Sequence, residues 1–251
     1  MIVAGNSPRP REVLPTPLQT LSGFNGLADY WTGGLGVKAP QEGGDRSFLA
    51  AILAVGDNAF ITASRLVLGL GLSLVFGVGG GLLLGYVKPV RQFAYGPLNF
   101  LGVLPLLATV PLFAFWFGGT TKAAVLFILF GAGIVILRST LNAVENVPKE
   151  YVESAYTMGA RRLQVYRTVI APSIVPELRA GVQIALTFSW SLALGAELIG
   201  LQSGIGRIMV LALRFSEVDR MILIGLVFVI LASTSVLLFN RLADRLTRWA
   251  E

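Results

Sequence analysis

Apolar residues follow one another in long blocks through most of this chain, instead of alternating regularly with polar residues as in an amphipathic element. A helix rises about 1.5 Å per residue and the hydrocarbon core of a bilayer is about 30 Å thick, so one span needs roughly 20 mostly uncharged residues. Five blocks satisfy this requirement: residues 66–87, 98–118, 122–140, 179–201 and 220–240. The pattern therefore predicts an all-α fold, a polytopic bundle of five transmembrane helices.

The first 63 residues follow a different pattern. They are rich in proline and glycine and show no periodicity until Phe48. Residues 48–61 then carry apolar side chains at helical spacing, which predicts an interfacial helix. We therefore expect an N-terminal extracytoplasmic or irregular segment, 1–63, that contains this helix and is followed by a transmembrane domain, 64–251.

The positions of lysine and arginine predict the orientation of the spans. Basic residues gather in the long loop 142–178 and in the C-terminal tail, so both should be cytoplasmic. Five spans then place residues 1–63 outside, although Met1 begins neither a signal peptide nor a long apolar run. Either the first span translocates this segment or a further N-terminal span is missing, and we favour a missing sixth span.

The amino-acid composition excludes several classes of function. Charged residues make up 14% of the chain, against about 25% in an average soluble domain, and 54% of the residues are hydrophobic. The chain has no cysteine and no histidine, which excludes disulfides, thiol chemistry, imidazole general bases and histidine metal sites, so no metal site is expected. The net charge of +6 does not indicate nucleic acid, because the basic residues are scattered between apolar blocks as in membrane-protein loops.

The first predicted span carries small residues at every fourth position, which places them on one helix face. They are Gly69, Ser73, Gly77, Gly81 and Gly85. Small residues on one face let a neighbouring helix approach closely, so we expect a packing surface there. No strand precedes these glycines and no Gly-Lys-Ser/Thr follows them, so they are not a phosphate-binding loop. No nucleotide-binding motif occurs elsewhere in the sequence, so the chain cannot itself hydrolyse ATP by a P-loop mechanism.

Glu197 is the one carboxylate well inside an apolar span, 179–201. An intramembrane charge is costly, which makes Glu197 a candidate for the translocation pathway. The alternative, which we favour, is that it lies near the outer interface and pairs with an exterior arginine such as Arg207. Other polar residues of this span either line a polar path or form hydrogen bonds between helices, and the second is favoured for each of them. They are Thr187, Ser189, Trp190 and Ser191.

The loop 142–178 contains a short helix with a sharp end. Pro148 suits the first turn of a helix and Gly159 suits a left-handed cap, which predicts about ten helical residues between them. A second amphipathic piece follows and should stop at Pro172 and Pro176. An apolar knob on the first helix would suit a groove in a soluble partner, with an interfacial hairpin as the alternative. The knob consists of Tyr151, Ala155 and Met158.

This loop closely resembles the membrane subunits, or permeases, of ATP-binding cassette (ABC) importers. Their signature reads Glu-Ala-Ala, three residues, Gly, nine residues, Ile, one residue, Leu-Pro. The matching positions are Glu153, Ser154, Ala155, Gly159, Val169, Ala171 and Pro172. The three departures from the signature are all small or apolar, so the resemblance still implies docking to an ATPase.

Other segments are similar to the nitrate, sulfonate and taurine permeases of this family and follow the order expected for that subgroup. They are Leu14-Pro15-Thr16-Pro17, Ser64-Arg65, Val110-Pro111 with Trp116-Phe117-Gly118, and Ala196-Glu197 with Gly204-Ile205-Gly206. Members of the subgroup commonly have an additional span before the Leu-Pro motif. This agrees with the missing sixth span inferred from the topology.

The resemblance implies a permease subunit that is not an enzyme and holds no cofactor. Two copies, as a homodimer, would form the translocation pathway in the cytoplasmic (inner) membrane of a bacterium, surrounded by lipids. A dimer of cytoplasmic ATPases would bind ATP and magnesium, and an extracytoplasmic substrate-binding protein would deliver a small anion such as a sulfonate, taurine or nitrate. The residues implied to couple the permease to the ATPase are Tyr151, Glu153, Ser154, Ala155, Met158, Gly159 and Pro172.

Two other classes of function need features that the sequence does not show. A self-sufficient carrier or channel would need ionisable or broken-helix sites near the bilayer midplane and internal repeats. The sequence shows neither, apart from the ionisable side chain of Glu197. An intramembrane enzyme would need histidine, cysteine or paired carboxylates in the spans. An ABC permease is therefore the favoured function, with a self-sufficient secondary carrier or channel as the alternative.

Overall fold

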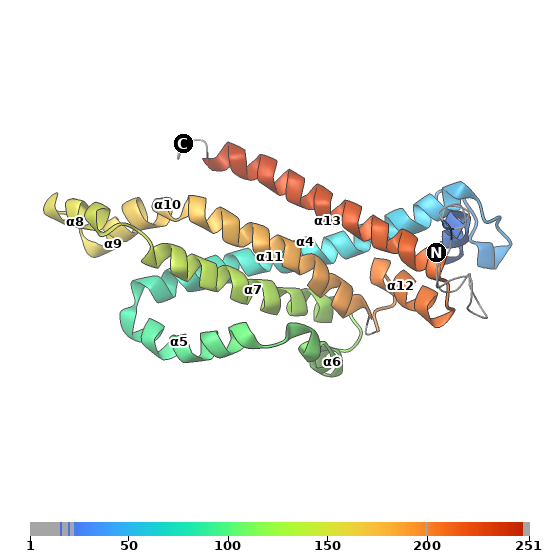
Figure 1. Cartoon of the computed structure of the whole chain (residues 1–251), viewed down its shortest axis with the longest axis horizontal. Coiled ribbons are helices and arrows are strands. Elements are labelled where there is room, and N and C mark those ends of the chain that lie inside the picture. The colour runs from blue at the N-terminus through green and yellow to red at the C-terminus, as the bar shows by residue number, and fades with distance from the viewer. Residues whose placement is uncertain (1–15, 17–19, 21–22, 199, 248–251) are drawn as a thin grey trace.

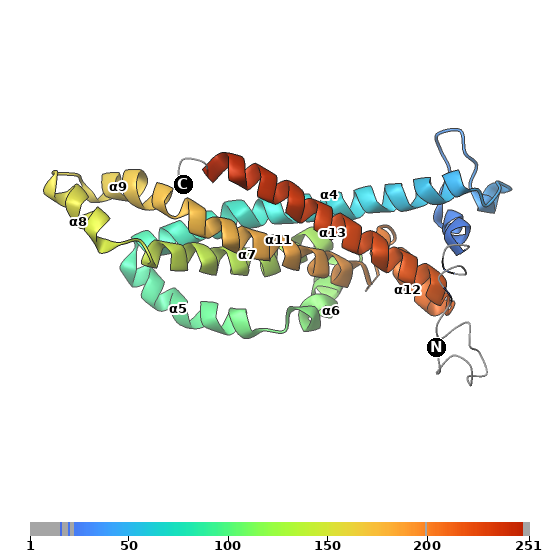
Figure 2. The same ribbon diagram turned by 45° about the horizontal axis from the view of Figure 1, so that its top comes forward.

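The computed structural model describes residues 16, 20, 23–198 and 200–247. All regular elements in this part of the chain are helices, so the expected all-α class is confirmed. Four long helices run lengthwise beside one another (Figures 1 and 2). They are α4 (Phe48–Tyr86), α7 (Thr121–Glu145), α11 (Val175–Leu198) and α13 (Val218–Thr247).

Helix α4 is longer than the sequence pattern predicted. Its first turn is capped by the Ser47 hydroxyl, which accepts a hydrogen bond from the Ala50 N–H at 3.1 Å. The helix then continues without a break, so residues 48–61 are the first part of α4 and not a separate interfacial helix. No proline interrupts the chain between these residues and the predicted first span, so nothing ends the helix there.

The predicted span 98–118 is not a straight helix. It is divided between α5 (Lys88–Val103) and α6 (Leu106–Phe117), which are bent by 98° relative to each other. The break lies at Pro105, which has no N–H to donate and disfavours a helical conformation for Leu104 before it, whose ψ is 128°. Hydropathy does not register this break because both sides of it are apolar.

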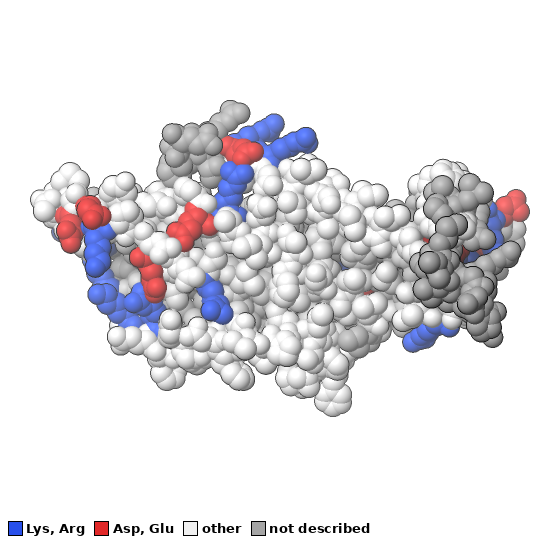
Figure 3. Space-filling model, viewed as in Figure 1, with Lys and Arg blue, Asp and Glu red and all other residues white. Residues whose placement is uncertain are grey.

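Three of the described helices, α4, α7 and α13, are each long and apolar enough to cross a membrane. Two bent pairs add further candidates: α5 with α6, and residues 162–173 with α11, which are bent by 57°. The predicted five spans are therefore reached if each bent pair is counted as one span. On the face shown in Figure 3, charged side chains are spread over the left half and appear again at the right end, with an uncharged surface between these two groups.

The stripe of small residues on α4 packs against α7, as predicted. A Cβ added at Gly69 would lie 2.7 Å from the Cβ of Ile128, and one added at Gly77 would lie 2.9 Å from that of Ile136. Ser73 of the same stripe is fully buried, and its hydroxyl donates to the Gly69 carbonyl at 2.7 Å. The two backbones lie this close because the stripe carries no side chain of ordinary size.

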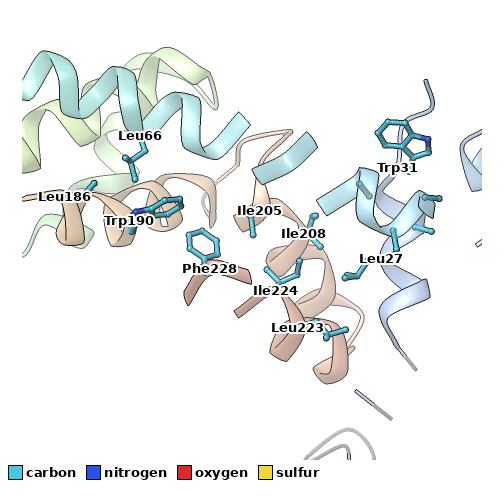
Figure 4. Close-up of a cluster of buried hydrophobic side chains, with 14 residues drawn as sticks. Leu27, Trp31, Leu66, Leu186, Trp190, Ile205, Ile208, Leu223, Ile224 and Phe228 are labelled. Carbon is cyan, nitrogen blue, oxygen red and sulfur yellow. The ribbon is translucent and has the colours of Figure 1, made fainter. Parts of the chain in front are cut away.

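A cluster of buried apolar side chains lies where α4, α11 and α13 meet two shorter helices, α12 (Ile205–Arg214) and the 3-10 helix η1 (Gly23–Tyr30) (Figure 4). Trp190 and Phe228 meet edge to face there, with ring centroids 5.9 Å apart. Leu27 of η1 is fully buried in the same cluster. Part of the segment expected to be irregular is therefore packed into the bundle. We call the end of the molecule that is covered by η1 and α12 the capped end.

Candidate functional site

The end of the molecule opposite η1 is formed by two short projecting helices, α8 (Lys149–Thr157) and α9 (Arg162–Val165) (Figures 1 and 2). We call residues 149–166 the elbow. The predicted short helix is confirmed by α8.

The chain does not stop after α9 as the two prolines predicted. It passes through a π-helical turn, η3 (Tyr166–Ile170), and through α10 (Ala171–Ser173) into α11. Pro172 and Pro176 each lie in the first turn of a helical segment, where an N–H has no helical partner to lose. The helix therefore bends by 57° instead of ending, and Pro172 is half-buried at this bend.

The turn inside the elbow is a Schellman motif. The Gly159 N–H donates to the Tyr156 carbonyl at 2.9 Å, and the Ala160 N–H donates to the Ala155 carbonyl at 3.1 Å. Gly159 has a φ of 81°, a conformation that glycine adopts without the clash that a side chain would cause. The predicted left-handed cap is therefore confirmed, and it fixes the angle at which α8 leaves the bundle.

The elbow exposes most of the side chains that the resemblance assigned to ATPase coupling. Met158 is 81% exposed, and Tyr151, Glu153 and Ser154 are exposed as well. Ala155 is instead buried on the inner side, where α8 packs against α9 and η3. Ala155 was therefore wrongly included in the expected apolar knob, because its side chain packs α8 against the rest of the elbow.

The elbow is fastened to the end of α4. The Arg162 guanidinium donates a hydrogen bond to the Tyr86 carbonyl and lies 4.6 Å from the centroid of the Tyr86 ring. The Tyr166 hydroxyl donates to the Leu82 carbonyl, and its ring meets that of Tyr86 edge-on with centroids 5.1 Å apart. Two side chains that follow the Schellman turn thus hold the last turns of α4, so the elbow and α4 are joined by directional bonds as well as by packing.

A buried ion pair joins α4 to α11. Arg65 and Glu197 are 3% and 1% exposed, and Arg65 Nη1 lies 2.7 Å from Glu197 Oε1. The same guanidinium donates to the carbonyl and hydroxyl of Ser203 at 2.8 and 2.7 Å, and from Nε and Nη2 to the Thr121 hydroxyl at 3.3 and 3.2 Å. All five N–H donors of Arg65 therefore have an acceptor. This buried charge is both paired and fully hydrogen-bonded, which its burial requires.

The Glu197 carboxylate is also held by α4 and by the turn before α12. The Gly206 N–H donates to Oε2 at 2.9 Å, and the Thr62 hydroxyl lies 2.9 Å from Oε1. Asn58 Oδ1 accepts a hydrogen bond from the Gly204 N–H at 2.8 Å, and a Cβ added at Gly204 would overlap the carboxylate. In the described part of the chain, acidic side chains nowhere form a group of three that could hold a metal ion. The polar cluster, as we call it, comprises Asn58, Thr62, Arg65, Glu197 and the turn 203–206.

The sequence identified Glu197 as unusual but predicted the wrong partner for it. Arg207, the expected partner, donates instead to the backbone and side-chain oxygens of Gln202. Arg65 was missed as a site residue because it lies just before the predicted span 66–87, where a basic residue is ordinary. The signal that could have identified Arg65 was the helical periodicity of residues 48–61. If this helix is joined to the predicted span 66–87, Arg65 lies in the interior of one long helix.

Two of the pathway candidates on α11 are buried inside the chain. The Ser189 hydroxyl donates to the Ala185 carbonyl at 2.7 Å, and the Trp190 indole N–H donates to the Ser235 hydroxyl at 2.8 Å. Trp190 thus forms a hydrogen bond between helices, which was one of the two expectations for these residues. Their polar atoms, like those of Glu197, are used inside this chain and do not line an open path in this structure.

The remaining two candidates, Thr187 and Ser191, are exposed on another face of α11. Gln183, one turn before them, completes a row of polar side chains spaced four residues apart. The row borders an open hollow of about 520 Å³. Its lining residues are Ala180, Gln183, Ile184, Thr187, Phe188 and Ser191.

Comparison with known proteins identifies relatives along most of the chain. Residues 73–250 match the family described as the inner membrane component of binding-protein-dependent transport systems. The taurine transport system permease protein TauC of Escherichia coli (strain K12) is 31% identical over 207 residues, which cover 82% of this chain and 74% of TauC. A relative from Bacillus subtilis (strain 168), whose description names transport of aliphatic sulfonates, is 28% identical over 192 residues, covering 76% of this chain and 68% of its own.

A solved structure has a similar fold. A chain of the MetNI methionine ABC transporter, in inward facing conformations, superposes with a TM-score of 0.65 and 22% identity, covering 82% of this chain and 99% of its own. The matched family segment contains the elbow, the Gly159 turn and Glu197. The chain therefore belongs to the family of inner membrane components of binding-protein-dependent transport systems, as a multi-pass permease subunit of an ABC importer and not an enzyme.

Proposed function

We propose that the elbow is the surface through which a separate dimer of cytoplasmic ATPases drives this permease. The observation that carries the proposal is the Schellman turn, which holds an exposed helix at a fixed angle on a base fastened to α4. Several large apolar side chains of the elbow are exposed, as they are where a protein partner binds. They are Tyr151, Tyr156, Met158 and Leu163.

In this proposal the coupling residues divide into two groups. Tyr151, Glu153, Ser154 and Met158 contact the ATPase. Ala155 and Gly159 shape the elbow that presents them, and Pro172 lies at the bend that joins the elbow to α11. ATP and magnesium are bound by the ATPase, and the permease needs no cofactor of its own. Nucleotide-driven closure of the ATPases then displaces the elbow and shifts the permease between its two conformations.

The test compares two glycines with the same backbone conformation at opposite ends of the molecule. Gly159→Asp forces a side chain into a φ of 81° within the elbow, so we expect the variant to lose co-purification with its P-loop ATPase subunit. Gly36→Asp imposes the same strain at a φ of 79°, with nothing within 4 Å, and should retain the ATPase. A Gly159→Asp permease that still binds the ATPase and stimulates ATP hydrolysis by it would overturn the proposal.

The translocation pathway forms between two copies of the chain, with the α11 faces turned toward each other. The polar row of Gln183, Thr187 and Ser191 supports this arrangement, because polar side chains in a membrane face a protein interior or a water-filled cavity more readily than lipid. The hollow beside the row is open in one chain and would be closed by a second.

The absence of cysteine makes this arrangement directly testable. Cysteine placed at Thr187 should be cross-linked between copies by a short bismaleimide in membranes. Cysteine placed at Val75, an exposed position on α4, is the control and should not be cross-linked. Equal cross-linking at both positions would contradict the pathway face.

The substrate is a small anion, such as a sulfonate, taurine or nitrate, delivered by an extracytoplasmic binding protein to a permease in the inner membrane of a bacterium. The descriptions of the relatives support this class of substrate. Arg207 and Arg214 lie two helical turns apart on α12 and line one hollow of about 350 Å³ near the capped end, and positive charge there attracts anions.

The binding protein offers the sharper test of substrate class. Titration calorimetry of that protein with taurine, alkanesulfonates and nitrate should detect binding of at least one anion, with neutral amino acids of similar size as the control. Binding of neutral or cationic compounds alone would overturn the substrate class and leave the ATPase-driven permease intact.

A further inference from the structure

Helix α4 runs without a break from the residues that it contributes to the polar cluster to the residues that contact the elbow. Near its C-terminus, the carbonyl groups of Leu82 and Tyr86 accept hydrogen bonds from the elbow. Nearer its N-terminus, Asn58, Thr62 and Arg65 hold the turn 203–206. Arg65 and Leu82 are about 25 Å apart along the helix axis, and a rigid element of this length carries a displacement from one end to the other.

Each residue of the turn 203–206 is hydrogen-bonded to a side chain of the polar cluster. The Ser203 carbonyl accepts from Arg65, and the Gly204 and Ile205 N–H groups donate to Asn58 and Thr62 at 2.8 and 3.0 Å. The Gly206 N–H donates to Glu197. Because α12 begins at Ile205, these bonds also satisfy the first N–H groups of α12, which have no partner inside that helix. The turn and α12 are therefore attached to α4 as one unit.

Stability alone does not account for the ion pair at the centre of this attachment. A buried pair of charges can often be replaced by apolar residues of similar volume with no loss of stability, because desolvation offsets the attraction between the charges. The five directional bonds of Arg65 instead fix three other segments relative to α4: Thr121 at the start of α7, Ser203 in the turn, and Glu197 on α11. The distinctive effect of these bonds is therefore to fix the positions of α7, α11 and the turn relative to α4.

We propose that Arg65 and Glu197 are positioning residues for transport. They lock the turn 203–206 and α12 onto α4, so that a displacement of the elbow, received at Leu82 and Tyr86, moves α12 at the capped end. Neither residue contacts substrate, since both side chains are buried. This inference rests on the proposed function, because it requires an ATPase at the elbow.

The test measures the movement of α12 and does not depend on knowing the substrate. Spin labels are placed at Leu213 on α12 and Phe115 on α6, two exposed positions of the cysteine-free chain, in the complex with its ATPase in lipid nanodiscs. The distance between the labels should change when ATP, magnesium and vanadate are added. Arg65→Gln combined with Glu197→Gln should abolish this change while the complex stays assembled and hydrolyses ATP, because removing both charges leaves neither one unpaired.

Ser73→Ala is the matched control. Ser73 is also buried and hydrogen-bonded on α4, but it faces α7 and makes no bond to the turn, so its loss should leave the distance change intact. If the double variant fails to assemble, Thr62→Val takes its place: it removes one hydroxyl that holds Ile205, keeps the ion pair, and should reduce the distance change.

Three results distinguish this inference from the proposed function. A full distance change in the double variant, or in Thr62→Val where that variant replaces it, would overturn the positioning role. No distance change in the unsubstituted complex, with ATPase bound and active, would overturn it as well. Failure of the unsubstituted chain to bind the ATPase would instead overturn the function on which the inference rests.

Discussion

At the scale of single residues, glycines set the separation between α4 and α7. Gly77 faces Ile136, so Gly77→Val should force the helices apart and lower the free energy of unfolding by about 1–3 kcal/mol. Gly79 on the same helix has nothing within 4 Å, so Gly79→Val should have little effect. The measurement is the apparent unfolding temperature of the purified permease in detergent. An equal loss in both variants would contradict the role assigned to the stripe.

Two Schellman turns differ in the residue at their left-handed position. Gly159 occupies it in the elbow, whereas Ser216 occupies it after α12 at a φ of 57°, with the Glu217 N–H donating to the Ala212 carbonyl at 2.8 Å. A side chain in this conformation costs about 1 kcal/mol, so Ser216→Gly should raise the apparent unfolding temperature. Gly159→Ser should lower it by a similar amount. A fall on Ser216→Gly would show that the serine side chain is needed there.

Residue-level features could be predicted from the sequence where they depend on neighbours along the chain. The spacing from Gly69 to Gly85 identifies a helix face, and the cap at Gly159 follows from a short helix that ends in glycine. The partner of Glu197 could not be found in this way, because Arg65 is 132 positions distant and only the fold brings the two charges together. The nearer candidate, Arg207, was wrong for the same reason.

At the scale of elements, the elbow depends on the side chains that fasten it to α4. Tyr166→Phe removes the hydroxyl that donates to the Leu82 carbonyl, at a cost of about 1 kcal/mol. We therefore expect faster hydrogen exchange of the backbone amides of residues 149–166. Tyr156→Phe is the control, because Tyr156 is exposed on the same elbow and its hydroxyl has no bonding partner among the described residues. Equal exchange in the two variants would contradict the fastening role.

The existence of the helices could be predicted from hydropathy, but their ends and bends could not. Apolar blocks predicted α7, α11 and α13 close to their actual positions. The same blocks concealed the 98° bend at Pro105, because hydropathy measures burial in lipid and not backbone direction. The bend near Pro172 was misread as a stop, since a proline in the first turn of the next helical segment redirects a chain without ending its helical course.

At the scale of the whole molecule, the capped end and the elbow should lie on opposite sides of the membrane. Single cysteines at Leu35 and Met158, both highly exposed, should react with a membrane-impermeant maleimide from opposite faces of sealed vesicles. A cysteine at Val75, in the middle of α4 and also exposed, should react from neither face, because hydrocarbon excludes the reagent. Labelling of Leu35 and Met158 from the same face would contradict the arrangement of the spans.

The length of α4 has a consequence for the N-terminal part of the chain. Its 39 residues measure about 58 Å, and even a tilt of about 40° leaves about 45 Å along the membrane normal, more than the roughly 30 Å of hydrocarbon. At least about a dozen residues of α4 therefore form a stalk outside the lipid tails. Helix η1 is a hood over this stalk: Phe24 contacts Phe48 with ring centroids 5.0 Å apart, and Ala50 and Ala54 are buried beneath it. Deletion of η1 would expose Ala50 and Ala54 to water, directly below the turns of α4 that carry Asn58 and Thr62.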